Sequence, residues 1–203
     1  MQRIVGYFTL VLVTLLLTSS AYSGTIFYPK QGSFQLRGTI KPSTVYPVIK
    51  NIKKHLKTSK EVWLLIDSTG GSVFPTMDLI RVMKQAQYRG AKFHCIVTRY
   101  AMSAAFYIYS MCNTRYAVKY SRHLYHDGRL NVYMGSFDED SLTANGINMT
   151  FLNNKINKDI RKALKLSKKK YDNHKEVMWF PSDLRAASPK FLTVVDDYKV
   201  RTK

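Results

Sequence analysis

The sequence predicts an α/β protein with mainly parallel strands flanked by helices, and two observations carry this prediction. Short, continuous apolar runs at residues 62–66 and 93–97 are typical of strands buried on both faces. Segments with helical periodicity lie before, between and after these runs, so strand and helix alternate several times. Such alternation predicts parallel strands that are joined by right-handed crossovers.

Hydrophobic periodicity assigns the remaining elements in chain order. Residues 33–40 largely alternate apolar and polar side chains, as a half-buried strand does. Residues 45–56 carry apolar side chains at helical spacing, with lysines on the other face. The predicted strands are 33–40, 62–66, 93–97, 115–118, 123–125 and 191–195. The predicted helices are 45–56, 77–86, 103–111 and 151–171, and residues 180–182 are expected to form a loop.

Length and composition fit one folded domain behind a processed N-terminal segment. The chain has 203 residues, of which 45% are hydrophobic and 13% aromatic. This composition can furnish a dense core, which excludes disorder over most of the chain. The sequence has no internal repeat and no low-complexity tract, so we predict a single domain over residues 24–203.

The first 23 residues have the pattern of a secretory signal peptide. Arg3 supplies the charged start, residues 4–17 form the apolar region, and Ala21-Tyr22-Ser23 is a small-x-small cleavage site. The alternative is an uncleaved membrane anchor, but the apolar run is shorter than the about 20 residues that a spanning helix needs. We therefore expect an exported protein, periplasmic or secreted, that begins near Gly24.

The chain is strongly basic. Its net charge is +19, and loss of Arg3 with the signal peptide would leave +18. A cation of this size is expected to bind anionic surfaces non-specifically, although the same charge can simply keep a surface soluble. The sequence has no zinc finger, no aromatic-basic RNA motif and no basic heptad, so no dedicated nucleic-acid recognition is predicted.

Three parts that acyl-transfer chemistry requires occur in order along residues 61–128. The pair Gly70-Gly71 after a buried strand can bring backbone N–H groups close to an oxyanion. Ser103 precedes an apolar helix and His126 follows a strand-like run. Each part also has an ordinary structural reading: a tight turn, a helix N-cap and a polar strand end. By the alternation of a strand, His123 shares a face with Tyr125 and points opposite to His126.

Other chemistries are less well supported by the residues. His55, His94 and His174 are further histidine candidates, and composition does not choose among them. The glycine pair lacks the Gly-Lys-Ser/Thr of a P-loop and the spacing of a dinucleotide site. Neither cysteine belongs to a cluster with zinc-ligand spacing, and we predict no metal and no cofactor.

Three sequence segments together match the pattern of one protein family. The first is Asp67-Ser68-Thr69-Gly70-Gly71-Ser72-Val73, and the second is Ala101-Met102-Ser103-Ala104-Ala105. The third comprises Arg115-Tyr116, Ser121-Arg122 and His126. In this order and spacing they resemble the proteolytic subunit of the Clp protease, in the Clp protease/crotonase superfamily. The resemblance implies a fold of repeated β-β-α and βαβ units. It also implies that Ser103 is the nucleophile and His126 the general base, with an oxyanion hole formed by the N–H groups of Gly71 and Ala104 and shaped by Gly70.

The chain departs from the family pattern at three places. Arg99 stands where a glycine usually precedes the serine segment, and Thr69 replaces a proline. Alignment of Phe180-Pro181-Ser182 with the family's Phe-x-Ser places His174 where the triad aspartate usually stands. Asp172, two residues earlier, is the tentative acid, whereas Asp127 is expected to point away from His126. A triad acid orients the imidazole and stabilises its cation.

The resemblance implies a serine hydrolase that cleaves peptide bonds through an acyl-enzyme on Ser103. No nucleotide or ATP-driven partner is expected outside the cytoplasm. The alternative is a catalytically inactive Clp-like binding or scaffold protein that uses its basic surface. Acyl-CoA chemistry, as in crotonases, fits the pairing of Ser103 with His126 less well.

Two further expectations follow from the predicted topology. Cys95 lies early in a strand and Cys112 ends the helix that returns alongside it, so we predict a disulfide between them in an oxidising compartment. The long helix at residues 151–171 resembles the element by which Clp subunits pair. A homo-oligomer is therefore expected, although the lysine-rich surface argues against a copy of the family's ring.

Overall fold

A six-stranded parallel sheet forms the centre of the computed structural model, which describes residues 24–128 and 139–201. The predicted signal peptide at residues 1–23 lies outside this range. The main path of the sheet runs β2-β3-β4-β5-β7, and β6 pairs with β4. The α/β class and the mainly parallel strands are thus confirmed. The strands are β2 (Ser33–Ile40), β3 (Glu61–Gly71), β4 (Lys92–Met102), β5 (Thr114–Val118), β6 (Arg122–Leu124) and β7 (Thr193–Val195).

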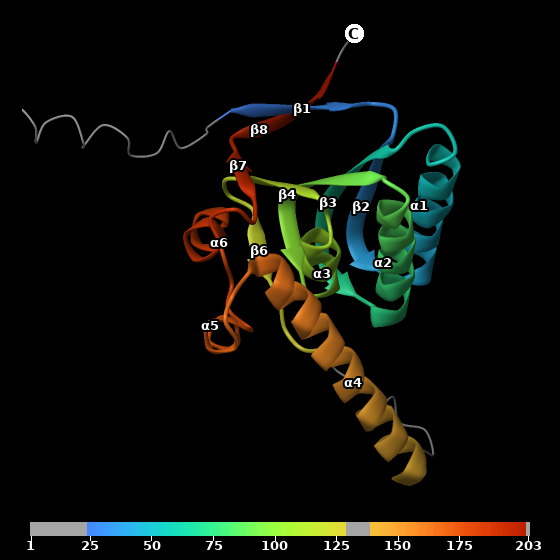
Figure 1. The fold of residues 1–203 in the computed structure, drawn as a ribbon, viewed down its shortest axis with the longest axis vertical. Coiled ribbons are helices and arrows are strands. Elements are labelled where there is room, and N and C mark those ends of the chain that lie inside the picture. The colour runs from blue at the N-terminus through green and yellow to red at the C-terminus, as the bar shows by residue number, and fades with distance from the viewer. Residues whose placement is uncertain (1–23, 129–138, 202–203) are drawn as a thin grey trace, which may run out of the picture.

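Helices cover one face of this sheet (Figure 1). The alternation along β3 shows why: Val62, Leu64 and Ile66 are buried in the large core beneath the helices. Phe93, Cys95 and Val97 of β4 are buried in the same core. The helices are α1 (Pro42–His55), α2 (Val73–Tyr88), α3 (Ala104–Ser110) and α4 (Glu139–Leu164).

A two-stranded sheet contributes to a small core on the other face. Leu65 of β3 and Ile96 of β4 point away from the helices and pack with Tyr28 in this second core. Tyr28 belongs to β1 (Thr25–Pro29), which pairs in parallel with β8 (Asp197–Arg201). Sequence periodicity identified neither strand, because each is short and its partner lies at the opposite end of the chain (Figure 1).

The C-terminal part differs from the prediction in three places. The long helix α4 begins at Glu139 instead of residue 151. The long helix ends at Leu164 instead of residue 171, because Lys165 adopts a left-handed φ of 54°. A separate short helix, α5 (Lys168–Asp172), then follows. Its N-cap is Ser167, whose side chain accepts the Lys170 N–H. The predicted loop at 180–182 is instead the start of α6 (Pro181–Ala187), whose first turn is closed by the Asp183 carboxylate.

The Asp159 carboxylate ties the second half of α4 to α2 and α3. Asp159 accepts hydrogen bonds of 2.7 Å from Lys84 on α2 and from the Tyr107 hydroxyl on α3. Partial burial raises the pKa of Asp159, but these two donors outweigh it and hold the pKa below its usual value. Buried Ile160 and Leu164 complete the contact, so α4 is held against the helices that flank the predicted site.

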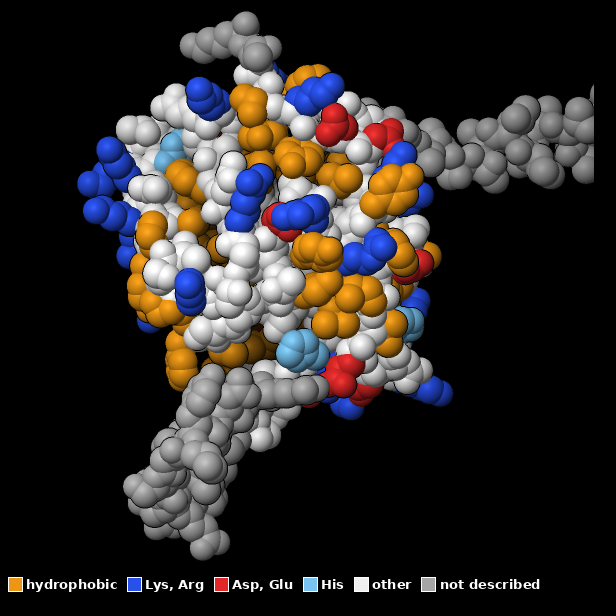
Figure 2. Space-filling model, turned by 180° about the vertical axis from the view of Figure 1, so that it is seen from behind, with side chains coloured by type: hydrophobic (Ala, Val, Ile, Leu, Met, Phe, Trp, Pro, Cys, Tyr) orange, Lys and Arg blue, Asp and Glu red, His pale blue; other side chains and the backbone are white. Residues whose placement is uncertain are grey.

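Lysine and arginine side chains are distributed across the surface drawn in Figure 2, among hydrophobic side chains and a few acidic ones. The positive charge is therefore spread broadly over this face. Among the helices of the described residues, none has the length and apolar character to cross a membrane.

Candidate active site

Pairing between β4 and β6 brings the serine and histidine segments together. Met102 at the end of β4 is in register with Leu124 at the end of β6. The Ser103 N–H continues this ladder with a 2.8 Å hydrogen bond to the Leu124 carbonyl, and His126 follows two residues later. Both residues therefore lie at the carboxyl edge of the parallel sheet, where open α/β folds bind their ligands.

Ser103 occupies a sharp turn from β4 into α3. Its backbone has φ 53° and ψ −125°, a conformation that costs a non-glycine residue about 1–3 kcal/mol. The Ser103 carbonyl accepts the N–H groups of Phe106 and Tyr107, at 3.0 and 3.2 Å, which starts the helix. Hydrolases with a nucleophile elbow present their serine on this kind of strained strand-to-helix turn.

Gly70 and Gly71 lie so close to neighbouring parts of the chain that a side chain would not fit at either position. A Cβ at Gly70 would lie 2.6 Å from the Ser103 Cβ, and Gly70 has φ 97°. A Cβ at Gly71 would overlap the Ile40 carbonyl on β2. The Gly70 N–H donates to the Ser68 hydroxyl at 3.1 Å, so this donor is used within the turn. Gly70 therefore packs directly against Ser103.

His126 is half-buried, and its hydrogen bond defines the tautomer. Its Nδ1 lies 2.6 Å from the carbonyl oxygen of Asp127. A carbonyl only accepts, so Nδ1 carries the hydrogen and Nε2 of the neutral ring has the free lone pair. This is the tautomer that a general base needs.

Ser103 and His126 line one small cavity, with a volume of about 30 Å³. No hydrogen bond joins their side chains among the described residues, and such bonds often tighten only when substrate binds. The volume corresponds to about one water molecule. The other lining residues come from α2, α3, α4 and the loop after β6: Val73, Thr76, Ala104, Tyr107, Gly128, Ile156 and Ile160.

The two predicted acid candidates form other contacts. The Asp172 carboxylate is half exposed and accepts from Lys168 at 2.7 Å, within α5. His174 donates from Nδ1 to the Lys170 carbonyl at 2.6 Å and packs on Trp179. Neither residue has a hydrogen bond to His126 in the part of the chain that the structure describes.

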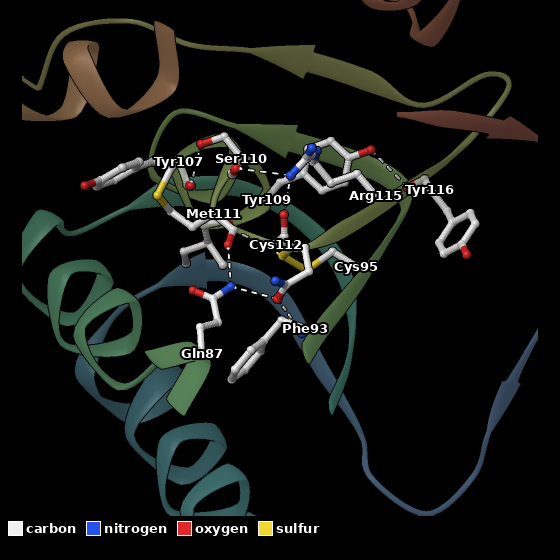
Figure 3. The surroundings of a disulfide bond; sticks show 12 residues. Gln87, Phe93, Cys95, Tyr107, Tyr109, Ser110, Met111, Cys112, Arg115 and Tyr116 are labelled. Carbon is white, nitrogen blue, oxygen red and sulfur yellow. Dashed lines mark hydrogen bonds between the residues drawn. A yellow bond between two sulfur atoms is a disulfide. The ribbon is translucent and has the colours of Figure 1, made fainter. Parts of the chain in front are cut away.

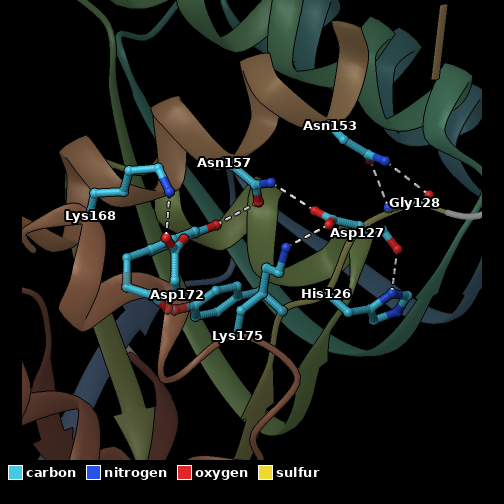
Figure 4. Close-up of polar contacts among 10 residues, drawn as sticks. His126, Asp127, Gly128, Asn153, Asn157, Lys168, Asp172 and Lys175 are labelled. Atoms are coloured by element: carbon cyan, nitrogen blue, oxygen red, sulfur yellow. Dashed lines mark hydrogen bonds and ion pairs between the residues drawn. The ribbon is translucent and has the colours of Figure 1, made fainter. Parts of the chain in front are cut away.

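The Asp127 carboxylate is directed away from the imidazole, as expected. It accepts from Asn157 at 2.7 Å and from Lys175 at 2.6 Å (Figure 4). Partial burial raises the pKa of Asp127, but hydrogen bonds from Lys175 and Asn157 outweigh burial and lower the pKa overall. Asp127 therefore remains charged and bound to those two partners.

Arg99, the residue in place of the family's glycine, forms an ion pair across the sheet. Its Nε and Nη2 donate to one oxygen of Asp67 on β3, at 2.9 and 2.7 Å. Asp67 is only 7% exposed, whereas the Arg99 side chain is 72% exposed. A buried carboxylate needs such a partner, so this arginine is tied to Asp67 at the start of the glycine segment.

A second serine–histidine pair, which sequence reasoning did not single out, lies behind the site. The Ser121 hydroxyl is 3.0 Å from Nε2 of His123, and both side chains are buried. Burial lowers the pKa of His123 to about 3. His123 and Tyr125 are both buried and both pack on Phe106, as expected for residues that share a face. A serine and a histidine two residues apart were the available signal for this pair.

The predicted disulfide between Cys95 and Cys112 is present, with a Cα–Cα distance of 6.1 Å. It joins β4 to the second residue after α3, so it closes the segment that contains Ser103. Arg115 donates to the Cys112 carbonyl, and Gln87 donates to the Met111 carbonyl at 2.9 Å (Figure 3). These donors satisfy carbonyl groups at the end of α3.

No group of three or more His, Cys, Asp or Glu side chains that could hold a metal ion occurs among the residues that the structure describes. Comparison with protein families finds a match to the family described as Clp protease over residues 30–173, which is more than half of the chain. No curated protein matches the sequence significantly.

Proposed function

Because the chain belongs to the Clp protease family, we propose that it is a serine hydrolase that cleaves peptide bonds through an acyl-enzyme on Ser103. The observation that carries this proposal is one cavity lined by both Ser103, on its strained turn, and His126, with Nδ1 protonated. The unprotonated Nε2 is the atom that can take the serine proton.

In the first step the Ser103 Oγ attacks the substrate carbonyl carbon while its proton passes to Nε2 of His126. The carbonyl oxygen becomes an oxyanion as the new C–O bond forms. The Ala104 N–H lies at the start of α3, where the first N–H groups have no helical partner. It is one proposed donor to the oxyanion.

The Gly71 N–H is the second proposed donor. The next N–H along the strand, that of Ser72, donates to the Ile40 carbonyl on β2 at 2.8 Å. Successive N–H groups of a strand point to opposite sides, which favours a Gly71 N–H directed towards β4 and Ser103. A side chain at Gly71 would overlap Ile40, so the close approach needs glycine here.

Collapse of the tetrahedral intermediate breaks the peptide C–N bond, and the leaving amine takes the proton from His126. Water then attacks the acyl-enzyme, with Nε2 accepting a proton from it and returning that proton to Ser103 Oγ. The small apolar cavity, of about 30 Å³, suits a methyl-sized group beside the carbonyl carbon. Peptides with alanine at that position are the substrates we expect to be preferred.

The setting of the reaction is part of the same proposal. The signal-like residues 1–23 and the Cys95–Cys112 disulfide support an exported protein in an oxidising compartment. We propose a homo-oligomer, because the Clp family commonly assembles into one, and non-specific contact of the basic surface with anionic partners.

A fluorophosphonate probe tests the proposal directly, because it reacts only with an activated serine. Wild-type protein should be labelled and Ser103→Ala should not. Ser121→Ala is the matched control, since it removes the hydroxyl of the buried Ser121–His123 pair and should leave labelling intact. Absence of labelling in folded wild-type protein would instead favour the binding or scaffold alternative.

A further inference from the structure

The residues expected to orient His126 are engaged elsewhere, so another group must hold the imidazole. Asp172 accepts from Lys168 and His174 donates to the Lys170 carbonyl. The bond that His126 does form runs from Nδ1–H to the main-chain carbonyl of Asp127, at 2.6 Å. That carbonyl is the group that faces the imidazole where a triad carboxylate would.

The carbonyl belongs to a peptide unit that is held from its other side. The Asp127 C=O and the Gly128 N–H form one planar, trans peptide, so the two groups point in opposite directions. The Gly128 N–H donates to the Asn153 Oδ1 at 2.8 Å. Anchoring the N–H to Asn153 therefore aims the carbonyl at His126, and the two bonds polarise each other through the peptide.

Side chains on one face of α4 also hold the groups on either side of this peptide unit. Asn153 also donates from Nδ2 to the Gly128 carbonyl at 3.1 Å. One turn later, Asn157 donates to the Asp127 carboxylate, which Lys175 holds from the opposite side (Figure 4). Residues four apart lie on one face of a helix, so both asparagines reach the loop after His126.

We propose that the Asp127–Gly128 peptide, anchored by Asn153, orients His126 in place of a triad carboxylate. Asn153 and Asn157 are then positioning residues, and Asp172 has no part in the site. The inference rests on the proposed function for the role of His126. The contacts themselves are independent of it.

The replacement has a chemical consequence. A neutral carbonyl selects the Nδ1–H tautomer as well as a carboxylate does, since both only accept hydrogen bonds. It provides less charge to stabilise the imidazolium that forms when the serine proton is transferred. The site is therefore oriented for catalysis but has a weaker electrostatic support for its base than a complete triad.

The tautomer of His126 is the sharpest readout, because a merely structural role for Asn153 would not change it. Nitrogen-15 NMR of imidazole-labelled protein near pH 8 should show His126 mainly as the Nδ1–H tautomer. Asn153→Ala should shift it towards the Nε2–H form and lower kcat/KM by roughly 10–100-fold. Asn153→Asp keeps an acceptor for the Gly128 N–H and should preserve both quantities substantially.

Asp172→Asn is the matched control and should change neither the tautomer nor the rate. A loss of the Nδ1–H form in Asp172→Asn, or its retention in folded Asn153→Ala, would overturn the inference. If Asn153→Ala does not fold, Asn153→Leu replaces it, because leucine removes the same acceptor for the Gly128 N–H but keeps the side-chain volume, and retention of the Nδ1–H form in folded Asn153→Leu would equally overturn the inference. Because the tautomer is measured without substrate, failure of the hydrolase proposal would appear separately, as a lack of probe labelling with the tautomer shift intact.

Discussion

Two serine–histidine pairs among the described residues differ in nearly every property except composition. Ser121 and His123 are hydrogen-bonded at 3.0 Å and buried, and the His123 ring packs on Phe106 and Tyr109. Ser103 and His126 are half-buried and line a cavity, with no mutual hydrogen bond among the described residues. A search for a bonded serine and histidine would choose the first pair.

Solvent access and the pKa of the histidine instead favour Ser103 and His126 as the proposed catalytic pair. His123 is fully buried, and its pKa of about 3 makes it a poor acceptor for the proton of a hydroxyl nucleophile at neutral pH. Ser103 lies beside the glycine turn and the first N–H groups of α3 and lines a cavity, whereas Ser121 is only 1% exposed. The comparison shows that a nucleophile depends on its surroundings more than on one short contact.

The largest expected effect is the loss of peptide hydrolysis on substitution of His126 but not of His123. His126→Ala should lower kcat/KM for peptide hydrolysis by about 10³-fold, because it removes the general base. His123→Gln keeps a partner for the Ser121 hydroxyl and should leave hydrolysis largely unchanged at pH 7.5. The measurement is steady-state hydrolysis of a short alanine peptide. If His123→Gln were the inactive variant, the assignment of the two pairs would have to be exchanged.

The disulfide closes the segment that contains Ser103, so its loss should affect stability before chemistry. Cys95 and Cys112 close a loop with a sequence separation of 17, and the double Cys→Ala variant should lose about 3 kcal/mol of unfolding free energy. Urea unfolding measures this loss. Probe labelling of Ser103 well below the transition should persist, and a thiol assay on denatured, oxidised wild type should detect no free thiol.

The smallest expected effect is a pH dependence of the unfolding free energy that arises from His123. Its folded pKa of about 3 lies below its ordinary value of 6.5, so the unfolded chain binds one more proton between these values. The stabilising contribution is complete above pH 6.5 and falls as the pH drops, by up to about 1.4 kcal/mol per pH unit. Urea unfolding between pH 7 and 5 should show this slope, and His123→Gln should reduce it. Equal slopes in both proteins would place the titration elsewhere.

Local patterns were sufficient for most elements of the core. The runs at 62–66 and 93–97 became the centres of β3 and β4, since their side chains alternate between two buried faces. The strand at Ser33–Ile40 was predicted with its observed ends. The strands β1 and β8 were missed because a short edge strand is stabilised by a partner that is remote in sequence.

The residues of the proposed active site were likewise predicted only in part. Ser103, His126 and the glycine pair were predicted from motif order and from the family resemblance, and the β4–β6 register places the serine and histidine at one cavity. Asp172 remains a sequence prediction for the acid, with Lys168 as its observed partner. Spacing alone did not indicate the buried Ser121–His123 pair, because burial depends on which helix packs over the strand.

By itself, the sequence determined the parallel α/β architecture, the disulfide partners and the order of the glycine, serine and histidine segments. These properties follow from periodicity and short-range spacing, which are written along the chain. Only the tertiary structure decided which histidine is buried and which carbonyl faces His126. Those outcomes depend on the packing of α3 and α4 against the sheet edge, where Asn153 and Asn157 meet a loop about 25–30 residues earlier in the sequence.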